Sequence, residues 1–229
     1  MIIYFELNSY KDSCEITKQM SVQWWSQFGE DSILAGLFPN NYIGVCVDVG
    51  SSDGISGNNT LHFERRGWRV LNIEPNPKLF AECEKIRKRS INCAVGAENK
   101  DSIPFTIFIL KGGNESAISG LEPDIRLIES HAHLIESEQV IKVPIRTLSS
   151  ILDEESFPTE IDFISIDTEN TELDVLKGLD LNKYKVKYFV IEDNFNEGKC
   201  GEYLKQFGYE HFYRLAVNNF YKIKDFGFE

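Results

Sequence analysis

The sequence contains no long apolar run, and this absence excludes one class of protein at the start. None of its 229 residues lies in an apolar stretch that approaches the length of a membrane-spanning helix. The N-terminal residues MIIYFELNSYKD have no basic region, no sustained apolar segment and no cleavage site of a secretory signal. We therefore expect a cytoplasmic protein that does not act at a membrane.

Cysteine pairs are also lacking. The five cysteines are odd in number, widely spaced and free of any CxxC pair, which argues against a disulfide framework and against a zinc site. Cys46 and Cys93 fall in apolar, strand-like runs, and Cys83 falls on the apolar side of a helical pattern. We therefore expect these three thiols to be buried.

Basic residues are in the minority, with 24 Lys and Arg against 36 Asp and Glu and a net charge of -12. Such a chain offers no broad basic surface to a nucleic-acid backbone, so we expect no nucleic-acid partner. Two local basic clusters, RRGWR at 65–69 and KIRKR at 85–89, are expected to be solvated helix ends.

The apolar segments predict an α/β fold in a single domain over residues 1–229, because no repeat and no linker interrupts them. YEHFYRLAVNNFYKI at 209–223 predicts a terminal antiparallel hairpin around a Val-Asn-Asn turn. Helical patterns separate several strand-like runs, which predicts a mostly parallel, doubly wound sheet. The runs with the composition of strands buried on both faces are 43–49, 68–74, 91–96, 161–167 and 186–193.

Helix boundaries have signals of their own. Residues 77–89 place apolar side chains on one helical face. Thr171 and Asp174 resemble a capping box, and Gly178 is a helix stop.

Two segments are candidates for covering a site. The polar stretch 111–140 is too long for an ordinary connection, so we predict a substrate lid loop there. Residues 1–40 are predicted to form a helical cap. In this cap, Trp24 and Trp25 either fold over the site, beside Gln27 and Asp31, or pack on the core.

The dinucleotide fingerprint GxGxxG is absent as well. Instead, the first strand runs into DVGSSDG, where Asp48, Gly50, Asp53 and Gly54 form a D-x-G-x-x-x-G pattern. The glycines let a ligand lie close to the backbone, and the carboxylates can accept hydrogen bonds from hydroxyl or ammonium groups. Glu74 follows Gly54 by twenty residues and ends the next strand, where an acid can bind both hydroxyls of a ribose. This combination predicts a nucleoside site.

Six segments, in order, resemble the motifs of the FkbM-type, S-adenosylmethionine-dependent methyltransferases. They are SQFGEDSIL (26–34), VDVGSSDGISGNNTLHFERRGW (47–68), NIEPNP (72–77), VPIRTLSSIL (143–152), FISIDTENTELDVLKGLD (163–180) and VIEDN (190–194). The resemblance implies a class I methyltransferase (Rossmann-like) fold, S-adenosylmethionine as methyl donor, and O-methylation of a sugar or polyketide hydroxyl. The sequence departs from the family pattern at Asn170, where glycine is more common, and at Asp193, where histidine is usual.

The resemblance also implies that Asp48, Gly50, Asp53, Gly54 and Glu74 bind the cofactor. We further predict that Ser51, Asn59, Pro75 and Asn76 contribute to the same cofactor site.

Methyl transfer to a hydroxyl needs a base or a metal ion that lowers the pKa of the hydroxyl. Asp167 or Glu192 can take the proton directly, with Asp193 as a third catalytic candidate. Alternatively, Asp167, Asp193 and Asn194 can hold Mg2+, because hard oxygen ligands suit this ion. Between these acids, Glu169 and Glu172 are expected either to contribute to the site or to be solvated residues of a helix first turn. The residues leave these alternatives open.

The resemblance thus implies an enzyme that O-methylates a sugar or sugar nucleotide, and we expect it to act in surface polysaccharide biosynthesis. A methyltransferase for a non-sugar hydroxyl and a non-catalytic nucleotide-binding module are the alternatives. Acids at three strand ends argue against the module, and the missing GxGxxG argues against a dehydrogenase.

Overall fold

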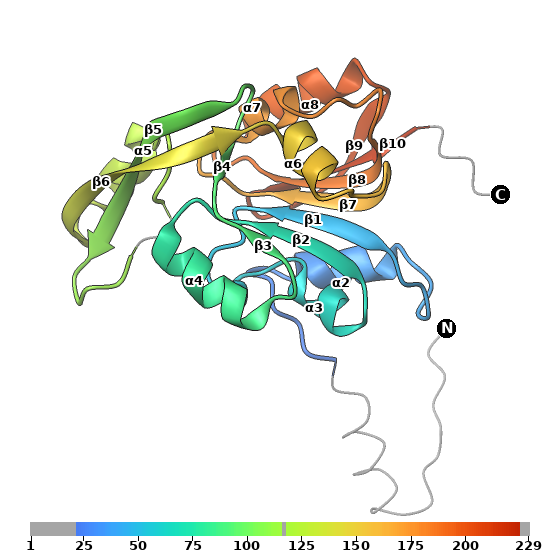
Figure 1. Cartoon of the computed structure of the whole chain (residues 1–229), viewed down its shortest axis with the longest axis horizontal. Helices are drawn as coiled ribbons and strands as arrows, with labels where there is room; N and C mark the ends of the chain where they lie inside the picture. The colour runs from blue at the N-terminus through green and yellow to red at the C-terminus, as the bar shows by residue number, and fades with distance from the viewer. Residues whose placement is uncertain (1–21, 116–117, 225–229) are drawn as a thin grey trace, which may run out of the picture.

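The computed structural model describes residues 22–115 and 118–224, and its main sheet has seven strands in the order β3-β2-β1-β7-β8-β10-β9 (Figure 1). All neighbours pair in parallel except β10, which is antiparallel to both β8 and β9. The switch point of the strand order lies between β1 and β7, where open α/β sheets bind ligands. The strands are β1 (Val45–Val49), β2 (Arg69–Ile73), β3 (Ser90–Ile91), β7 (Glu160–Ile166), β8 (Lys185–Glu192), β9 (Tyr209–Leu215) and β10 (Asn218–Ile223).

Helices cover both faces of this sheet. Alternate side chains of a central strand point to opposite faces, and the apolar side chains on each face form a separate core with the helices that cover it. Val47 packs with Leu148 and Ile151 in one core, whereas Cys46 packs with Phe63 in the other. Figure 1 shows α2, α3 and α4 below the sheet and α6, α7 and α8 above it. The helices are α2 (Glu30–Gly36), α3 (Leu61–Arg65), α4 (Pro77–Ile86), α6 (Leu148–Glu154), α7 (Glu172–Lys177) and α8 (Lys199–Lys205). The predicted doubly wound sheet with its terminal hairpin is confirmed.

A second, three-stranded sheet, β4-β6-β5, projects from the end of the domain (Figure 1). It consists of β4 (Ala94–Val95), β5 (Lys100–Leu110) and β6 (Ile135–Arg146), with α5 (Ile125–His131) between the two long strands. The strand predicted at 91–96 is therefore divided, because β3 pairs with β2 and β4 pairs with β6. The segment 111–140 is not an extended loop, since it holds α5 and the start of β6; its role as a lid stays a prediction.

Other element boundaries differ from the sequence prediction. The amphipathic helix ends at Ile86, three residues early, and Arg87 is extended with φ -93° and ψ 146°. The hairpin turns at Ala216 and Val217, so Asn218 already lies in β10. The capping box is wrong, because the side chain of Thr171 makes no capping hydrogen bond to α7.

Several simpler predictions hold. Cys46, Cys83 and Cys93 are free, buried thiols, whereas Cys14 lies outside the described residues. Gly178 ends α7 as predicted. Of the predicted N-terminal cap, the structure describes only residues 22–40, which contain α2.

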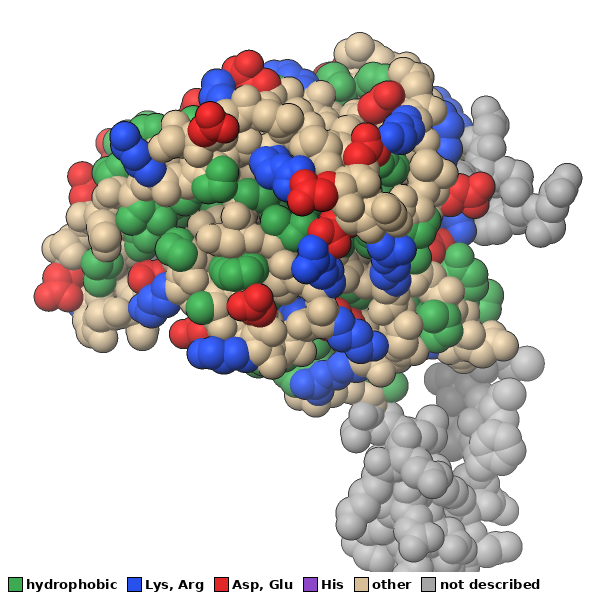
Figure 2. Space-filling model, in the orientation of Figure 1, with side chains coloured by type: hydrophobic (Ala, Val, Ile, Leu, Met, Phe, Trp, Pro, Cys, Tyr) green, Lys and Arg blue, Asp and Glu red, His purple; other side chains and the backbone are tan. Residues whose placement is uncertain are grey.

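Two further features of the structure, the distribution of surface charge and the length of the helices, concern nucleic acids and membranes as partners. Figure 2 shows acidic and basic side chains interspersed on the displayed face, without a continuous basic area. Within the described ranges, every helix is too short or too polar to cross a membrane.

Candidate functional site

A cavity of about 360 Å³ opens at the carboxyl ends of β1, β2 and β7. Residues from all three strand ends line it, as the strand order of the sheet predicts. Asp53 and Gly54 are not in its wall, although the sequence pattern grouped them with the site. The predicted residues that do line it are Asp48, Gly50, Ser51, Asn59, Glu74, Pro75, Asn76 and Asp167.

Gly50 lies where the backbone at the end of β1 contacts the backbone at the ends of β2 and β7. Its φ is 88°, and a Cβ atom there would lie 1.7 Å from the carbonyl oxygen of Asp167. The amides of Gly50 and Ser51 both donate to the carbonyl oxygen of Ile73, at 2.9 Å and 3.1 Å. Only glycine permits both this backbone conformation and this close approach. The first glycine of the motif therefore shapes the floor of the cavity.

Glu74 is buried, and its carboxylate holds two loops together. One oxygen accepts from the amide of Ser52 at 2.8 Å and the other from the amide of Asn76 at 2.8 Å. Burial raises its pKa to about 7 despite these two hydrogen bonds. Each carboxylate oxygen can accept a second hydrogen bond, so the predicted ribose contact is compatible with this arrangement.

Asp48 and Asp53 have different surroundings. Asp48 is buried, which raises its pKa, and it accepts from Asn58 Nδ2 at 2.7 Å and Thr60 Oγ1 at 2.8 Å. Asp53 accepts from the amides of Ile55 and Ser56 at the tip of the loop. Burial opposes ionisation of Asp53, but these amides outweigh it and lower the pKa. Asp48 thus stiffens the cavity wall, and Asp53 shapes the turn outside it.

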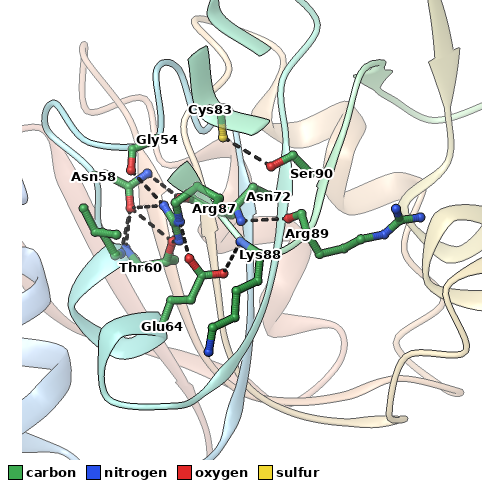
Figure 3. Close-up of polar contacts among 12 residues, drawn as sticks. Gly54, Asn58, Thr60, Glu64, Asn72, Cys83, Arg87, Lys88, Arg89 and Ser90 are labelled. Carbon is green, nitrogen blue, oxygen red and sulfur yellow. Dashed lines mark hydrogen bonds and ion pairs between the residues drawn. The ribbon is translucent and has the colours of Figure 1, made fainter. Parts of the chain in front are cut away.

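Arg87 is a structural residue that the sequence analysis misplaced. The basic cluster 85–89 was expected to be solvated, yet the side chain of Arg87 is completely buried. Its Nε donates to Glu64 at 2.8 Å, and its two terminal nitrogens donate to Gly54 O, Asn58 Oδ1 and Thr60 Oγ1 (Figure 3). The same Asn58 and Thr60 side chains bind Asp48, so one buried cation ties the glycine loop to the cavity wall.

Carboxyl groups gather on the other side of the cavity. One oxygen from each of Asp167, Glu169 and Glu192 lies within 4.8 Å of the other two. Asp167 and Glu169 line the cavity, whereas Glu192 lines a smaller neighbouring cavity of about 70 Å³. The three acids therefore stand between the two cavities.

These carboxyl groups resist ionisation. Burial raises the pKa of all three, and the like charges of the neighbouring carboxylates raise these pKa values further. Asp167 is the most acidic of them, with a pKa raised to about 7, and protonated Glu192 donates a hydrogen bond to it. Asp167 is thus the member whose charge changes near neutral pH.

Glu169 and Glu172 are not solvated residues of a helix turn, as one of the two interpretations had it. Glu169 precedes α7 with φ 56°, and its Oε2 is buried without a partner. Glu172 is buried and accepts hydrogen bonds from the amides of Thr168 and Asn170. The acids of IDTENTE are therefore held inward by a tight backbone turn that the residue spacing did not predict.

Asp193, in contrast, stabilises a loop. One oxygen of its carboxylate accepts from the amide of Glu197 at 2.8 Å and the other from the amide of Gly198 at 2.9 Å. Asp193 and Asn194 line the smaller cavity beside Glu192. The catalytic and Mg2+ roles predicted for them stay predictions, and the carboxyl oxygens that the fold brings together come from other residues.

The segment before α2 lies against the glycine loop. Ser26 pairs with Gly57 as an isolated β-bridge, and Gln27 lines the cavity, as one of the two interpretations expected. Asp31 instead accepts from the amides of Trp25 and Ser26.

The two tryptophans pack on α3. Trp24 contacts the ring of His62 with centroids 4.5 Å apart, and the guanidinium of Arg65 lies 4.2 Å from the ring centroid of Trp25. The segment therefore both packs on α3 and borders the cavity.

Several solved methyltransferases are similar to this chain in structure, at low sequence identity. A TehB-like S-adenosylmethionine-dependent methyltransferase from Corynebacterium glutamicum is 11% identical, with a TM-score of 0.46, over 93% of this chain and 97% of its own. TrmK from M. capricolum, solved with S-adenosyl-homocysteine, is 13% identical, with a TM-score of 0.41, over 87% and 68%. The N-terminal domain of human METTL16 is 12% identical, with a TM-score of 0.42, over 86% and 68%.

The sequence comparison is more specific. No curated protein matches the chain significantly. The model of the methyltransferase FkbM domain matches residues 48–216, which include the glycine loop, Glu74, the carboxyl cluster and the first strand of the terminal hairpin. This match covers more than half of the sequence, and the order of the seven strands is that of a class I methyltransferase. The chain therefore belongs to the FkbM methyltransferase family.

Proposed function

We propose that the protein transfers a methyl group from S-adenosylmethionine to a hydroxyl group of a sugar or sugar nucleotide. The observation that carries this proposal is the position of the carboxyl cluster. Asp167 lies in the wall of the larger cavity, and Glu192, to which it is hydrogen-bonded, lies in the wall of the smaller one. A proton acceptor thus lies where a cofactor in the larger cavity would meet a methyl-accepting substrate that enters from the smaller cavity.

The larger cavity has the donor and acceptor groups that S-adenosylmethionine requires. Its size is within the range of small-molecule sites. Glu74 can accept hydrogen bonds from a ribose, and the buried Oδ1 of Asn59 has no partner among the described residues. Among the residues that the structure describes, no arginine or lysine lines this cavity, which suits a ligand without phosphate groups. When bound, S-adenosylmethionine supplies an electrophilic methyl group.

The protein's own part in the reaction is to orient the hydroxyl and to remove its proton. A general base works best when its pKa lies near the operating pH. Asp167 meets this condition with a pKa of about 7. Glu192 keeps its proton and donates a hydrogen bond to Asp167, which keeps the Asp167 carboxylate oriented in the wall of the cavity. Positioning contributes as well, because the transfer needs the hydroxyl, the methyl carbon and the sulfur in line.

The sugar acceptor and the role in surface polysaccharide biosynthesis rest on the family resemblance. The smaller cavity supports a polyol acceptor, because carboxylate and amide groups of Asp193, Asn194 and Asn170 line it beside Phe195. Such groups suit hydroxyl recognition, and an aromatic ring suits the apolar face of a sugar.

Two experiments test the proposal in sequence. Calorimetry should detect binding of S-adenosylmethionine and of S-adenosyl-homocysteine but not of NAD; the reverse result rejects the enzyme class. A mass-spectrometric screen for the gain of one methyl group should then compare free sugars, sugar nucleotides and non-sugar alcohols. Methylation confined to the non-sugar alcohols would reject the acceptor class and leave the enzyme class intact.

A further inference from the structure

The carboxyl cluster contains more buried negative groups than its surroundings compensate. Glu192 is 9% exposed, and its Oε2 has no hydrogen-bond partner among the described residues. The Oε2 atom of Glu169 is likewise buried without a partner. Buried carboxyl oxygens are almost always hydrogen-bonded, so two orphans in one cluster indicate that a proton or a cation is needed there.

Basic side chains do not fill this role in the described part of the chain. The charged groups with the largest effect on the pKa of the three acids are carboxylates, namely Asp48, Glu30 and Glu172, together with the cluster members themselves. The ion pairs of the described residues involve none of the three. Three ionised carboxylates at this separation would repel each other strongly in a buried site. The cluster must hold either protons or a cation.

The carboxyl cluster can be reached from solvent through both cavities, which favours a cation that exchanges with solvent. Asp167 and Glu169 face the larger cavity and Glu192 faces the smaller one, so an ion could reach the three oxygens from either side. Oxygen atoms within 4.8 Å of one another are close enough to share one ion, since Mg2+ and Ca2+ bind oxygen ligands at about 2.0–2.6 Å.

We propose that Asp167, Glu169 and Glu192 bind one divalent cation of the magnesium and manganese class between the two cavities. Three carboxylate oxygens leave the remaining ligand positions to water or to hydroxyl groups of the acceptor, as is usual for these hard ions. This site differs from the one predicted from the sequence, because Asp193 is engaged with the amides of Glu197 and Gly198. The ion and the proton of Glu192 exclude each other, so in the ion-bound protein Asp167 is a ligand and the ion, in place of the base, would lower the pKa of the hydroxyl. Only this benefit for methyl transfer rests on the proposed function; the binding itself does not.

The test is a titration of the full-length protein with Mn2+, after treatment with EDTA and desalting. Paramagnetic resonance measures free Mn2+, and calorimetry measures heat. The variants are Glu169→Gln and Glu192→Gln, which keep the side-chain shape, and the control is Glu202→Gln, whose carboxylate pairs with Lys205 on the surface. Thermal unfolding verifies that each variant is folded.

The expected result is one Mn2+ site in the parent and in Glu202→Gln. Each cluster variant should weaken binding about tenfold or more, because affinity for these ions depends on the number of charged ligands. Binding should also be tighter at pH 8 than at pH 6, since the ligands must lose their protons. Two results would overturn the proposal: no saturable binding at millimolar Mn2+, or unchanged binding in the double variant Glu169→Gln/Glu192→Gln. In either case the cluster would hold protons in place of a cation.

Failure of this proposal is distinguishable from failure of the proposed function. If Mn2+ binds as expected but no acceptor gains a methyl group, the cation site stands and the methyl transfer does not. If methyl transfer proceeds at full rate in EDTA and Mn2+ does not bind, the enzyme stands and the cation site is rejected.

Discussion

Arg87 and Glu64 form an ion pair, 2.8 Å between Nε and Oε2, from which solvent is excluded: their side chains are 0% and 4% exposed. Arg87 also donates to Gly54 O at 3.1 Å and to Thr60 Oγ1 at 2.7 Å (Figure 3). The pair therefore connects the end of α4 to Gly54 and Thr60, at two points of the glycine loop (residues 50–60) that follows β1. Buried pairs of this kind are costly to break, because the remaining charge has no partner.

Replacing Arg87 by methionine should consequently destabilise the protein by about 3–5 kcal/mol, since Glu64 would be left buried and unpaired. Urea unfolding measures the change. Lys85→Met is the matched control, because Lys85 lies on the exposed side of α4 and should lose less than about 0.5 kcal/mol. An Arg87→Met protein as stable as this control would contradict the structural role.

Gly50→Ala should unfold the site or the whole domain, because the new Cβ would overlap the carbonyl oxygen of Asp167. The control is Gly208→Ala, where φ is 84° and nothing lies within 4 Å of the new Cβ. This control isolates the cost of the backbone conformation, about 1–2 kcal/mol. Thermal unfolding should show a clearly larger loss for Gly50→Ala than for Gly208→Ala, and equal losses would refute the close packing.

Glu74→Ala should weaken the binding of S-adenosylmethionine by at least about tenfold, because it removes the predicted ribose acceptor and the hydrogen bonds to the amides of Ser52 and Asn76. Glu82→Ala on the exposed side of α4 should bind as the parent does. Calorimetry provides both affinities. If Glu74→Ala binds the cofactor as tightly as the parent, the ribose assignment is wrong, whatever the enzyme class.

Asp167→Asn should lower kcat by about 10²–10⁴, the usual contribution of a general base. Affinity for S-adenosylmethionine should change much less, because the ribose contact lies at Glu74. In the parent, kcat should rise with pH through about 7 as Asp167 ionises, and the variant should lose this dependence. If the variant retains both the rate and the pH profile of the parent, the general base is another group.

Protein stability should depend on pH through the same cluster. Burial and neighbouring carboxylates raise the pKa of Glu192, so the folded protein holds this proton more tightly than the unfolded chain. A carboxyl group of this kind contributes stability below its ordinary pKa of 4.5, and the contribution is lost as the pH rises through the raised value. In EDTA, urea unfolding should therefore give a free energy that falls between about pH 5 and pH 9.

Glu192→Gln should reduce this fall, because the glutamine amide cannot ionise and can donate to the Asp167 carboxylate. Glu202→Gln again serves as the control and should follow the parent. A slope that is identical in all three proteins would show that the cluster does not titrate in this range.

The sequence determined the parts of this protein that depend on local pattern and on strand order. Buried parallel strands need continuous β-branched runs, and chain connectivity fixes which of their ends carry ligands, so the glycine loop and Glu74 could be located without coordinates. The hairpin at the end of the chain was equally readable from its aromatic residues, although its turn lies at Ala216 and Val217.

Only the tertiary structure decided which polar side chains share a space. Nothing local separates Arg87 from its solvated neighbours in KIRKR; it is buried because α4 ends at Ile86 and the extended chain points it at Glu64. The same holds for Glu169 and Glu192, which are 23 residues apart in the sequence. The left-handed backbone at Glu169 and the parallel pairing of β7 with β8 bring their oxygens together, and no spacing rule encodes a contact between two strand ends.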